Sequence, residues 1–123
     1  MGLEMFKLDG KVAIVTGGSR GFGKAIALGL ADAGASVVVA SRTQADLDVV
    51  AEEIKSRGGK ALAVACDMLN RASIENLASA AISAFGKIDI LINNAGQGFN
   101  MPFLKLTEDQ WDQIINVNLK GYF

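Results

Sequence analysis

Residues 12–23 read Val-Ala-Ile-Val-Thr-Gly-Gly-Ser-Arg-Gly-Phe-Gly, and this stretch decides the fold. Its first four residues form a short apolar run with Val and Ile, which predicts a buried strand. Gly17, Gly21 and Gly23 follow, and an apolar helical pattern comes after them. A strand, a glycine-rich turn and a helix in this order direct free backbone N–H groups and the positive end of a helix dipole at a phosphate. The stretch therefore predicts a nucleotide-binding turn.

The same turn allows two other interpretations. Residues 18–25 read G-x-x-x-x-G-K-A, which differs at one residue from the P-loop of nucleoside triphosphatases. That loop needs Ser or Thr after the lysine to hold Mg²⁺ through its hydroxyl, and Ala25 has no hydroxyl. An ordinary structural glycine turn is the second alternative.

Composition bounds the class of protein. The chain has 123 residues, of which 50% are hydrophobic and one is proline, so we expect one globular domain with a real core. The net charge of −1 favours neither nucleic acid nor an anionic membrane as a partner. The single cysteine, Cys66, cannot form an internal disulfide, which favours a reducing compartment. Without a secretory signal or a membrane-spanning run, the cytoplasm is the expected location. We expect no metal ion.

Four short apolar runs alternate with helical patterns along the chain. The expected strands are residues 12–15, 37–40, 61–66 and 88–92. On the first helix, Phe22, Ile26 and Leu30 recur at helical spacing and define an inward face. Apolar strands throughout predict a parallel sheet covered on both faces. With right-handed crossovers, we expect an α/β, doubly wound parallel sheet with strand order 3-2-1-4.

The helix ends carry capping signals. Thr43 and Asn70 are expected to cap the second and third helices, and Gly86 to end the third. After a loop over 97–106, Thr107 and Gln110 are spaced as a capping box for a fourth helix. The expected inward face of this helix consists of Trp111, Ile114, Ile115, Asn118, Leu119 and Tyr122. The chain stops inside this helix.

Two motifs resemble the short-chain dehydrogenase/reductase family. They are Thr-Gly-x-x-x-Gly-x-Gly at 16–23 and Asn-Asn-Ala-Gly at 93–96, after the fourth predicted strand. The resemblance implies a Rossmann fold and an oxidoreductase that moves a hydride between a nicotinamide cofactor and a small carbonyl or alcohol substrate. In its pattern along the whole chain, the sequence looks most similar to gluconate or glucose dehydrogenases and 3-oxoacyl-carrier-protein reductases of this family.

The candidate cofactor-binding residues lie at the carboxyl ends of the predicted strands, where this fold binds its ligands. The resemblance implies that Asp67 and Met68 lie against an adenine ring. It also implies that Asn118, in Asn-Val-Asn-Leu-Lys-Gly, joins a catalytic proton relay through water. The expected cofactor-binding set is Gly17, Ser19, Arg20, Gly21, Phe22, Ser41, Arg42, Asp67, Met68, Asn94, Ala95 and Gly96.

Each polar candidate also has an ordinary structural interpretation. Asp67 can simply favour the start of the next helix. Asn94 can form an Asx-type turn. Asn118, on an apolar face, can satisfy a neighbouring backbone group, because a buried amide is costly unless it is bonded.

The residues after the second predicted strand bear on the choice of cofactor. Proteins that bind NAD usually place Asp or Glu here for the ribose 2′-hydroxyl, and residues 36–43 contain no acid. Ser41 and Arg42 stand there instead, and the glycine turn adds Ser19 and Arg20. Arginine can meet a 2′-phosphate with paired hydrogen bonds, so we expect NADP to be preferred over NAD. Two solvated surface arginines are the alternative.

The catalytic Ser and Tyr-x-x-x-Lys of the family have no counterpart in this sequence. The only tyrosine is Tyr122, and no lysine can follow it by four residues. We therefore expect residues 1–123 to be the cofactor-binding half of a longer enzyme, truncated in the helix after strand four and inactive alone. The resemblance implies a homo-oligomer, usually a tetramer, at full length. A non-catalytic nucleotide-binding module that acts with a partner chain is the alternative function.

Overall fold

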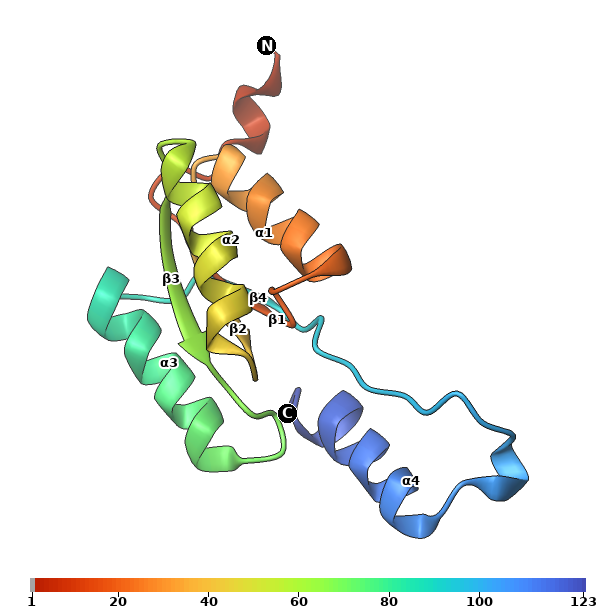
Figure 1. Ribbon diagram of the computed structural model, residues 1–123. Helices are drawn as coiled ribbons and strands as arrows, with labels where there is room; N and C mark the ends of the chain where they lie inside the picture. The colour runs from red at the N-terminus through yellow and green to blue at the C-terminus, as the bar shows by residue number, and fades with distance from the viewer. Residues whose placement is uncertain (1) are drawn as a thin grey trace.

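The computed structural model describes residues 2–123 and contains one parallel sheet (Figure 1). The chain runs η1 (Leu3–Phe6), β1 (Val12–Thr16), α1 (Gly21–Asp32), β2 (Ser36–Ser41), α2 (Gln44–Ser56), β3 (Lys60–Ala65), α3 (Arg71–Phe85), β4 (Ile90–Ile92), η2 (Phe103–Lys105), α4 (Glu108–Ile115) and η3 (Asn116–Lys120). All strand pairs are parallel, and the order is β3-β2-β1-β4. The predicted α/β doubly wound fold with order 3-2-1-4 is confirmed.

Neighbouring strand residues pack on opposite faces of the sheet. On one face, Val39 of β2 packs against Leu47 of α2. The helix α1 covers the same face, and β2, α1 and α2 all contribute to one apolar cluster. Val38 packs with Leu77 of α3 in a second cluster on the other face. Figure 1 shows α1 and α2 together on one side and α3 on the other. Complete burial of a side chain such as Leu47 stabilises the fold by roughly 1.5–3 kcal/mol.

The predicted helix ends are correct at three places. The side chain of Asn70 accepts a hydrogen bond from Ser73 N at 3.2 Å. Gly86 ends α3 in the left-handed conformation, with φ of 84°. Thr107 and Gln110 form the predicted capping box at the start of α4. Thr43 occupies the N-cap position of α2, but its side chain makes no cap hydrogen bond.

The expected extent of the fourth strand is wrong. Pairing with β1 begins at Ile90 rather than at residue 88. The carboxylate of Asp89 accepts the Val12 N–H at 2.8 Å, so a side chain replaces a ladder bond at this point. β4 is an edge strand, and 52% of Leu91 is exposed.

Three side chains expected to face inward are exposed instead. Phe22 is 85% exposed because the inward face of α1 passes through Gly23 and Ala27. Trp111 is 49% and Leu119 66% exposed. Trp111 lies in α4 and Leu119 in η3, which together form an arm at the end of a long loop, and α4 stands away from the sheet (Figure 1).

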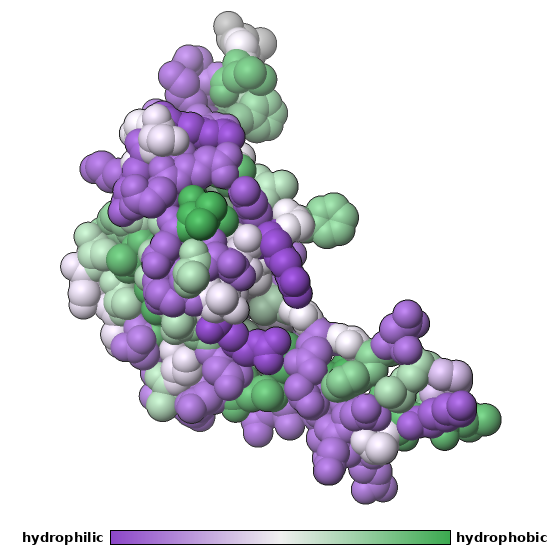
Figure 2. Space-filling view, in the orientation of Figure 1, coloured by the Kyte–Doolittle hydropathy of each residue, from purple (hydrophilic) through white to green (hydrophobic). Residues whose placement is uncertain are grey.

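The arm also ends differently from the expected continuous helix. The α-helical part stops at Ile115, and a π-helical turn over Asn116–Lys120 follows. Figure 2 shows the arm projecting from the rest of the molecule, and hydrophilic side chains over the outer face of α2. None of the helices within residues 2–123 is long and apolar enough to cross a lipid bilayer.

Candidate functional site

The glycine turn after β1 is packed too tightly for side chains. Gly17 has φ of +65°, a conformation that L side chains rarely adopt. A Cβ on Gly17 would lie 2.8 Å from Asn94 Nδ2, and a Cβ on Gly23 would lie 2.5 Å from the same atom and overlap Gly17 O. The glycines therefore bring the start of α1 directly against the carboxyl end of β4.

Thr16 joins the ends of β1 and β4. Its hydroxyl accepts hydrogen bonds from Asn94 N at 3.1 Å and Ala95 N at 3.0 Å, and donates to Ile92 O at 3.2 Å. The Asn94 amide completes the junction by donating to Thr16 O and Gly17 O, at 3.1 and 3.2 Å. Thr16 is 3% exposed, and the sequence analysis did not select it. Thr16 is the first residue of the Thr-Gly-x-x-x-Gly-x-Gly motif, between the strand and the glycine turn. That position was the signal from which a role at the site could have been predicted.

A cleft of about 330 Å³ opens at this edge of the sheet. It brings together every expected cofactor-binding residue except Phe22. The lining residues that the sequence analysis did not select are Thr16, Ala40, Cys66, Leu69, Gln97 and Val117. The side chain of Phe22 lies outside this set and is exposed to solvent, as described above.

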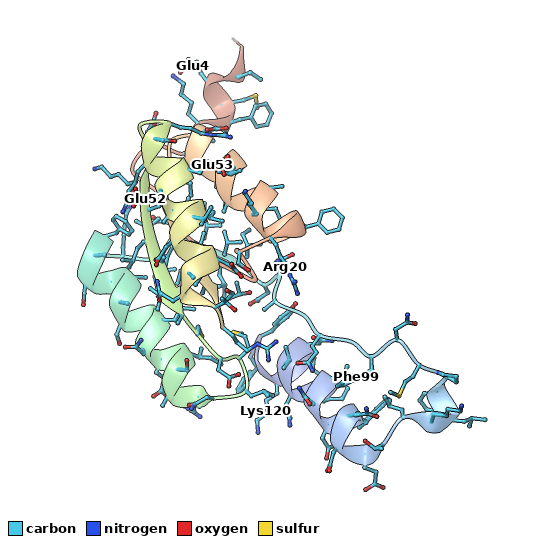
Figure 3. All side chains as sticks on the ribbon, viewed as in Figure 1. Glu4, Arg20, Glu52, Glu53, Phe99 and Lys120 are labelled. Carbon is cyan, nitrogen blue, oxygen red and sulfur yellow. The ribbon has the colours of Figure 1, made fainter. Side chains whose placement is uncertain are left out.

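Arg20 and Arg42 give the cleft its positive charge. Arg20 precedes α1, and Arg42 lies in the two-residue turn between β2 and α2. Figure 3 shows Arg20 at the head of α1, between that helix and the arm. Within the described part of the chain, neither arginine forms an ion pair, whereas Arg57 pairs with both Asp32 and Glu53. The two guanidinium groups at the cleft thus keep their capacity to bind an anion.

The β3 end of the cleft combines one acid with apolar groups. Asp67 Oδ1 accepts from Leu69 N at 2.9 Å, which forms a local turn, and Asp67 N donates to Ser73 Oγ at 3.0 Å. Burial raises the pKa of the neighbouring Cys66 thiol. A hydrogen bond to Ser73 partly opposes this rise in pKa, and the charge of Asp67 adds to it. A thiol held protonated in this way is a packing group rather than a nucleophile.

Asn118 supports the wall of the cleft rather than lining it. Its Oδ1 accepts from Gln97 N and its Nδ2 donates to Gln97 O, both at 2.8 Å. The hydroxyl of Tyr122, four residues further on, donates to Ala95 O. Two side chains of the arm therefore hold the segment that follows β4. Asn118 satisfies a neighbouring backbone group, the alternative that the sequence left open.

The chemistry of the cleft is that of an anion-binding site. It offers backbone N–H groups at a glycine turn, two arginines, amides and hydroxyls. Within residues 2–123, no three His, Cys, Asp or Glu side chains are grouped so that they could hold a metal ion.

Comparison with known proteins gives the family. The family model described as short chain dehydrogenase matches residues 11–123. An uncharacterized oxidoreductase of Mycobacterium tuberculosis is 53% identical over 94 residues, which cover 76% of this chain and 36% of that protein. A 2-dehydro-3-deoxy-D-gluconate 5-dehydrogenase of Pseudoalteromonas atlantica is 43% identical over 122 residues, which cover 98% of this chain and 48% of that protein.

Two solved structures show the same fold. A short-chain type dehydrogenase/reductase from Mycobacterium marinum has a TM-score of 0.92 at 39% identity, and the match covers 97% of this chain and 48% of that one. A metagenomic short-chain oxidoreductase, solved in complex with NADP, has a TM-score of 0.87 at 43% identity, with coverage of 93% and 52%. The chain thus spans about half the length of the curated relatives it matches, or less. The expected resemblance is confirmed, and the chain belongs to the short-chain dehydrogenase family.

Proposed function

We propose that residues 1–123 are the cofactor-binding portion of an NADP(H)-dependent oxidoreductase that interconverts a carbonyl and an alcohol. One observation carries the proposal: the glycine turn and the Asn94–Gly96 segment meet across a single cleft in which two arginines have no acidic partner within residues 2–123. That the metagenomic relative was solved with NADP supports the same reading of the site. When bound, the dinucleotide supplies a hydride at its nicotinamide ring.

The cleft fits a dinucleotide phosphate in shape. A Cβ at Gly17 or Gly23 would fill the space at the head of α1 where a backbone N–H must approach a phosphate closely. In this proposal, the turn holds the diphosphate. Asp67 and Met68 hold the adenine, and Asn94, Ala95 and Gly96 hold a ribose. Asp67 is the one acid among the lining residues described, and its carboxylate already accepts a hydrogen bond from Leu69 N.

The positive charge of the cleft also suits the negatively charged 2′-phosphate that distinguishes NADP from NAD. Arg42 follows β2 directly, at the position where a carboxylate usually meets the 2′-hydroxyl of NAD. Arg20 lines the same cleft, at the N-cap position one residue before α1. A hydrogen bond to a charged group contributes more than one between neutral groups, about 1.5–3 kcal/mol. We propose that these two arginines, with Ser19 and Ser41, hold the 2′-phosphate.

The arm provides the other end of the site in this proposal. Asn118 uses Oδ1 and one Nδ2 hydrogen on Gln97, which leaves the second Nδ2 hydrogen for a water of a proton relay. The groups that hold and protonate the substrate oxygen come from the part of the protein beyond these residues. The small-molecule substrate, a homo-oligomeric assembly at full length and a cytoplasmic location remain parts of the proposal.

The test replaces one arginine and compares two cofactors. In the full-length protein, Arg42→Ala should raise the Kd for NADPH by about tenfold to a hundredfold, the equivalent of one lost charged hydrogen bond. The Kd for NADH should change less than about twofold, because NADH carries no 2′-phosphate. Arg57→Ala is the matched control, since Arg57 is bound to Asp32 and Glu53 away from the cleft. Calorimetric titration that shows equal weakening of both cofactors would contradict the 2′-phosphate assignment.

A further inference from the structure

The first residue of α2 makes contacts that its surface position does not require. Gln44 Nε2 donates to Ala63 O at 3.3 Å, and Gln44 Oε1 accepts from Ala65 N at 3.1 Å. The same Nε2 donates to Asp48 Oδ1, one helical turn later, at 2.8 Å. The carboxamide is therefore held at both its donor and its acceptor end.

These contacts reproduce the hydrogen bonds of a strand. In a parallel ladder, one residue donates to the carbonyl of residue i−1 and accepts from the N–H of residue i+1 on its neighbour. The Gln44 amide makes this pair of bonds around Val64. β3 is the outer strand of the sheet, and its other edge is paired with β2. Gln44 thus occupies the edge of β3 as a substitute for one strand residue.

The position of Gln44 in the chain links its contacts with β3 to the cleft. Only Arg42 and Thr43 separate the end of β2 from Gln44. On the other side of this turn, Ser41 O accepts from Cys66 N at 2.7 Å. One flank of the Arg42 turn is therefore attached through its backbone to Cys66, the residue after β3, and the other is attached to β3 through the Gln44 side chain. Within the turn, Thr43 N donates to Ser41 Oγ at 3.4 Å, but the Thr43 side chain makes no cap bond.

We infer that Gln44 is a positioning residue. Its paired hydrogen bonds to the edge of β3 fix the turn that carries Arg42, so that the Arg42 side chain is placed to bind a 2′-phosphate. The inference rests on the proposed function, because it assigns a specificity role within that same site. A long, flexible arginine loses side-chain and backbone freedom when it binds an anion, and a turn fixed in advance has less freedom to lose. Gln44 itself does not line the cleft.

The experiment measures cofactor preference in the full-length protein. Gln44→Met keeps the length of the side chain and removes both hydrogen bonds to β3. It should raise the Kd for NADPH by about fivefold to tenfold, on the scale of one or two net hydrogen bonds. The Kd for NADH should stay within about twofold, so the ratio of Kd for NADH to Kd for NADPH falls. Gln44→Asn stays uncharged and keeps a carboxamide, but its side chain is one methylene shorter, so we expect weaker hydrogen bonds to β3 and an intermediate ratio.

One control and one fallback variant keep the result interpretable. Glu52→Met makes a change of similar size on the same helix, where Glu52 (Figure 3) is exposed and, within residues 2–123, pairs with Lys55 alone. It should leave the ratio of the two constants unchanged. If Gln44→Met fails to fold, the uncharged variant Gln44→Asn carries the test alone.

The outcomes separate the two claims. A wild-type protein that binds NADH as tightly as NADPH overturns the proposed function and this inference with it. A wild-type protein that prefers NADPH, with a ratio unmoved by Gln44→Met and Gln44→Asn, overturns only the role of Gln44. Equal weakening of both cofactors also overturns it, because that result describes a general loss of structure rather than a positioned arginine.

Discussion

The junction at Thr16 offers the sharpest test of how the site is built. Thr16→Val preserves the shape of the side chain and removes its hydroxyl. Ala95 N then has no acceptor in the structure, whereas Asn94 N keeps its 3.1 Å bond to Ile92 O. The bond from the hydroxyl to Ile92 O is lost as well.

The magnitude follows from these contacts. Leaving a part-buried donor such as Ala95 N unsatisfied costs about 1–3 kcal/mol, and losing one net hydrogen bond costs about 1 kcal/mol. We expect Thr16→Val to lower the free energy of unfolding by about 2–4 kcal/mol. Thr16→Ser keeps the hydroxyl and loses one buried methyl group, so it should cost only about 1 kcal/mol.

Urea unfolding of the full-length protein at one fixed protein concentration measures both variants, with Trp111 as one fluorescent probe. The concentration is fixed because assembly shifts apparent stability. Thr16→Val should also weaken NADPH and NADH by the same factor, because Asn94 and Ala95 line the cleft and are proposed to hold a ribose that both cofactors share. A Thr16→Val protein as stable as Thr16→Ser would refute the reasoning, since it would show that the hydroxyl is not what joins the two strand ends.

Two further predictions concern the turn and the edge of the sheet. Gly23→Ala should abolish measurable NADPH binding in a calorimetric titration, because the new Cβ overlaps Gly17 O and approaches Asn94 Nδ2 to 2.5 Å; wild-type affinity would show that the turn can move aside. The second concerns Asp89, whose pKa is held below its ordinary value of 3.8, mainly by the hydrogen bond from Val12 N–H and then by Lys87. A lowered folded pKa means that the stabilisation is complete above the unfolded pKa and disappears as pH falls through the folded one. The urea midpoint of wild type should therefore exceed that of Asp89→Asn at pH 6, and the gap should close below about pH 3.8; a constant gap would contradict this.

Much of the fold and the site follows from local patterns. The four apolar runs, the glycine turn and the Asn-Asn-Ala-Gly motif were enough to predict the strand order and the residues of one cleft. These features are readable because strand burial, left-handed glycines and capping bonds depend on residues close in sequence. Asn70, Gly86 and Thr107 behaved as their local signals predict.

The exceptions lie where packing, rather than local pattern, chooses the partner. Phe22 and Trp111 have helical spacing, but spacing alone does not say which face meets the sheet or whether the helix reaches it. β4 is shorter than its apolar run because the Asp89 carboxylate takes a ladder position.

The amino-acid sequence by itself determined the order of the elements and the chemistry available at the strand ends. Only the tertiary structure decided that Thr16 would accept the amides of residues 78 and 79 positions away, and that Gln44 would complete the edge of β3. Such contacts join segments far apart in the chain, and each polar group selects its partner only after the sheet has brought the candidates within hydrogen-bonding distance.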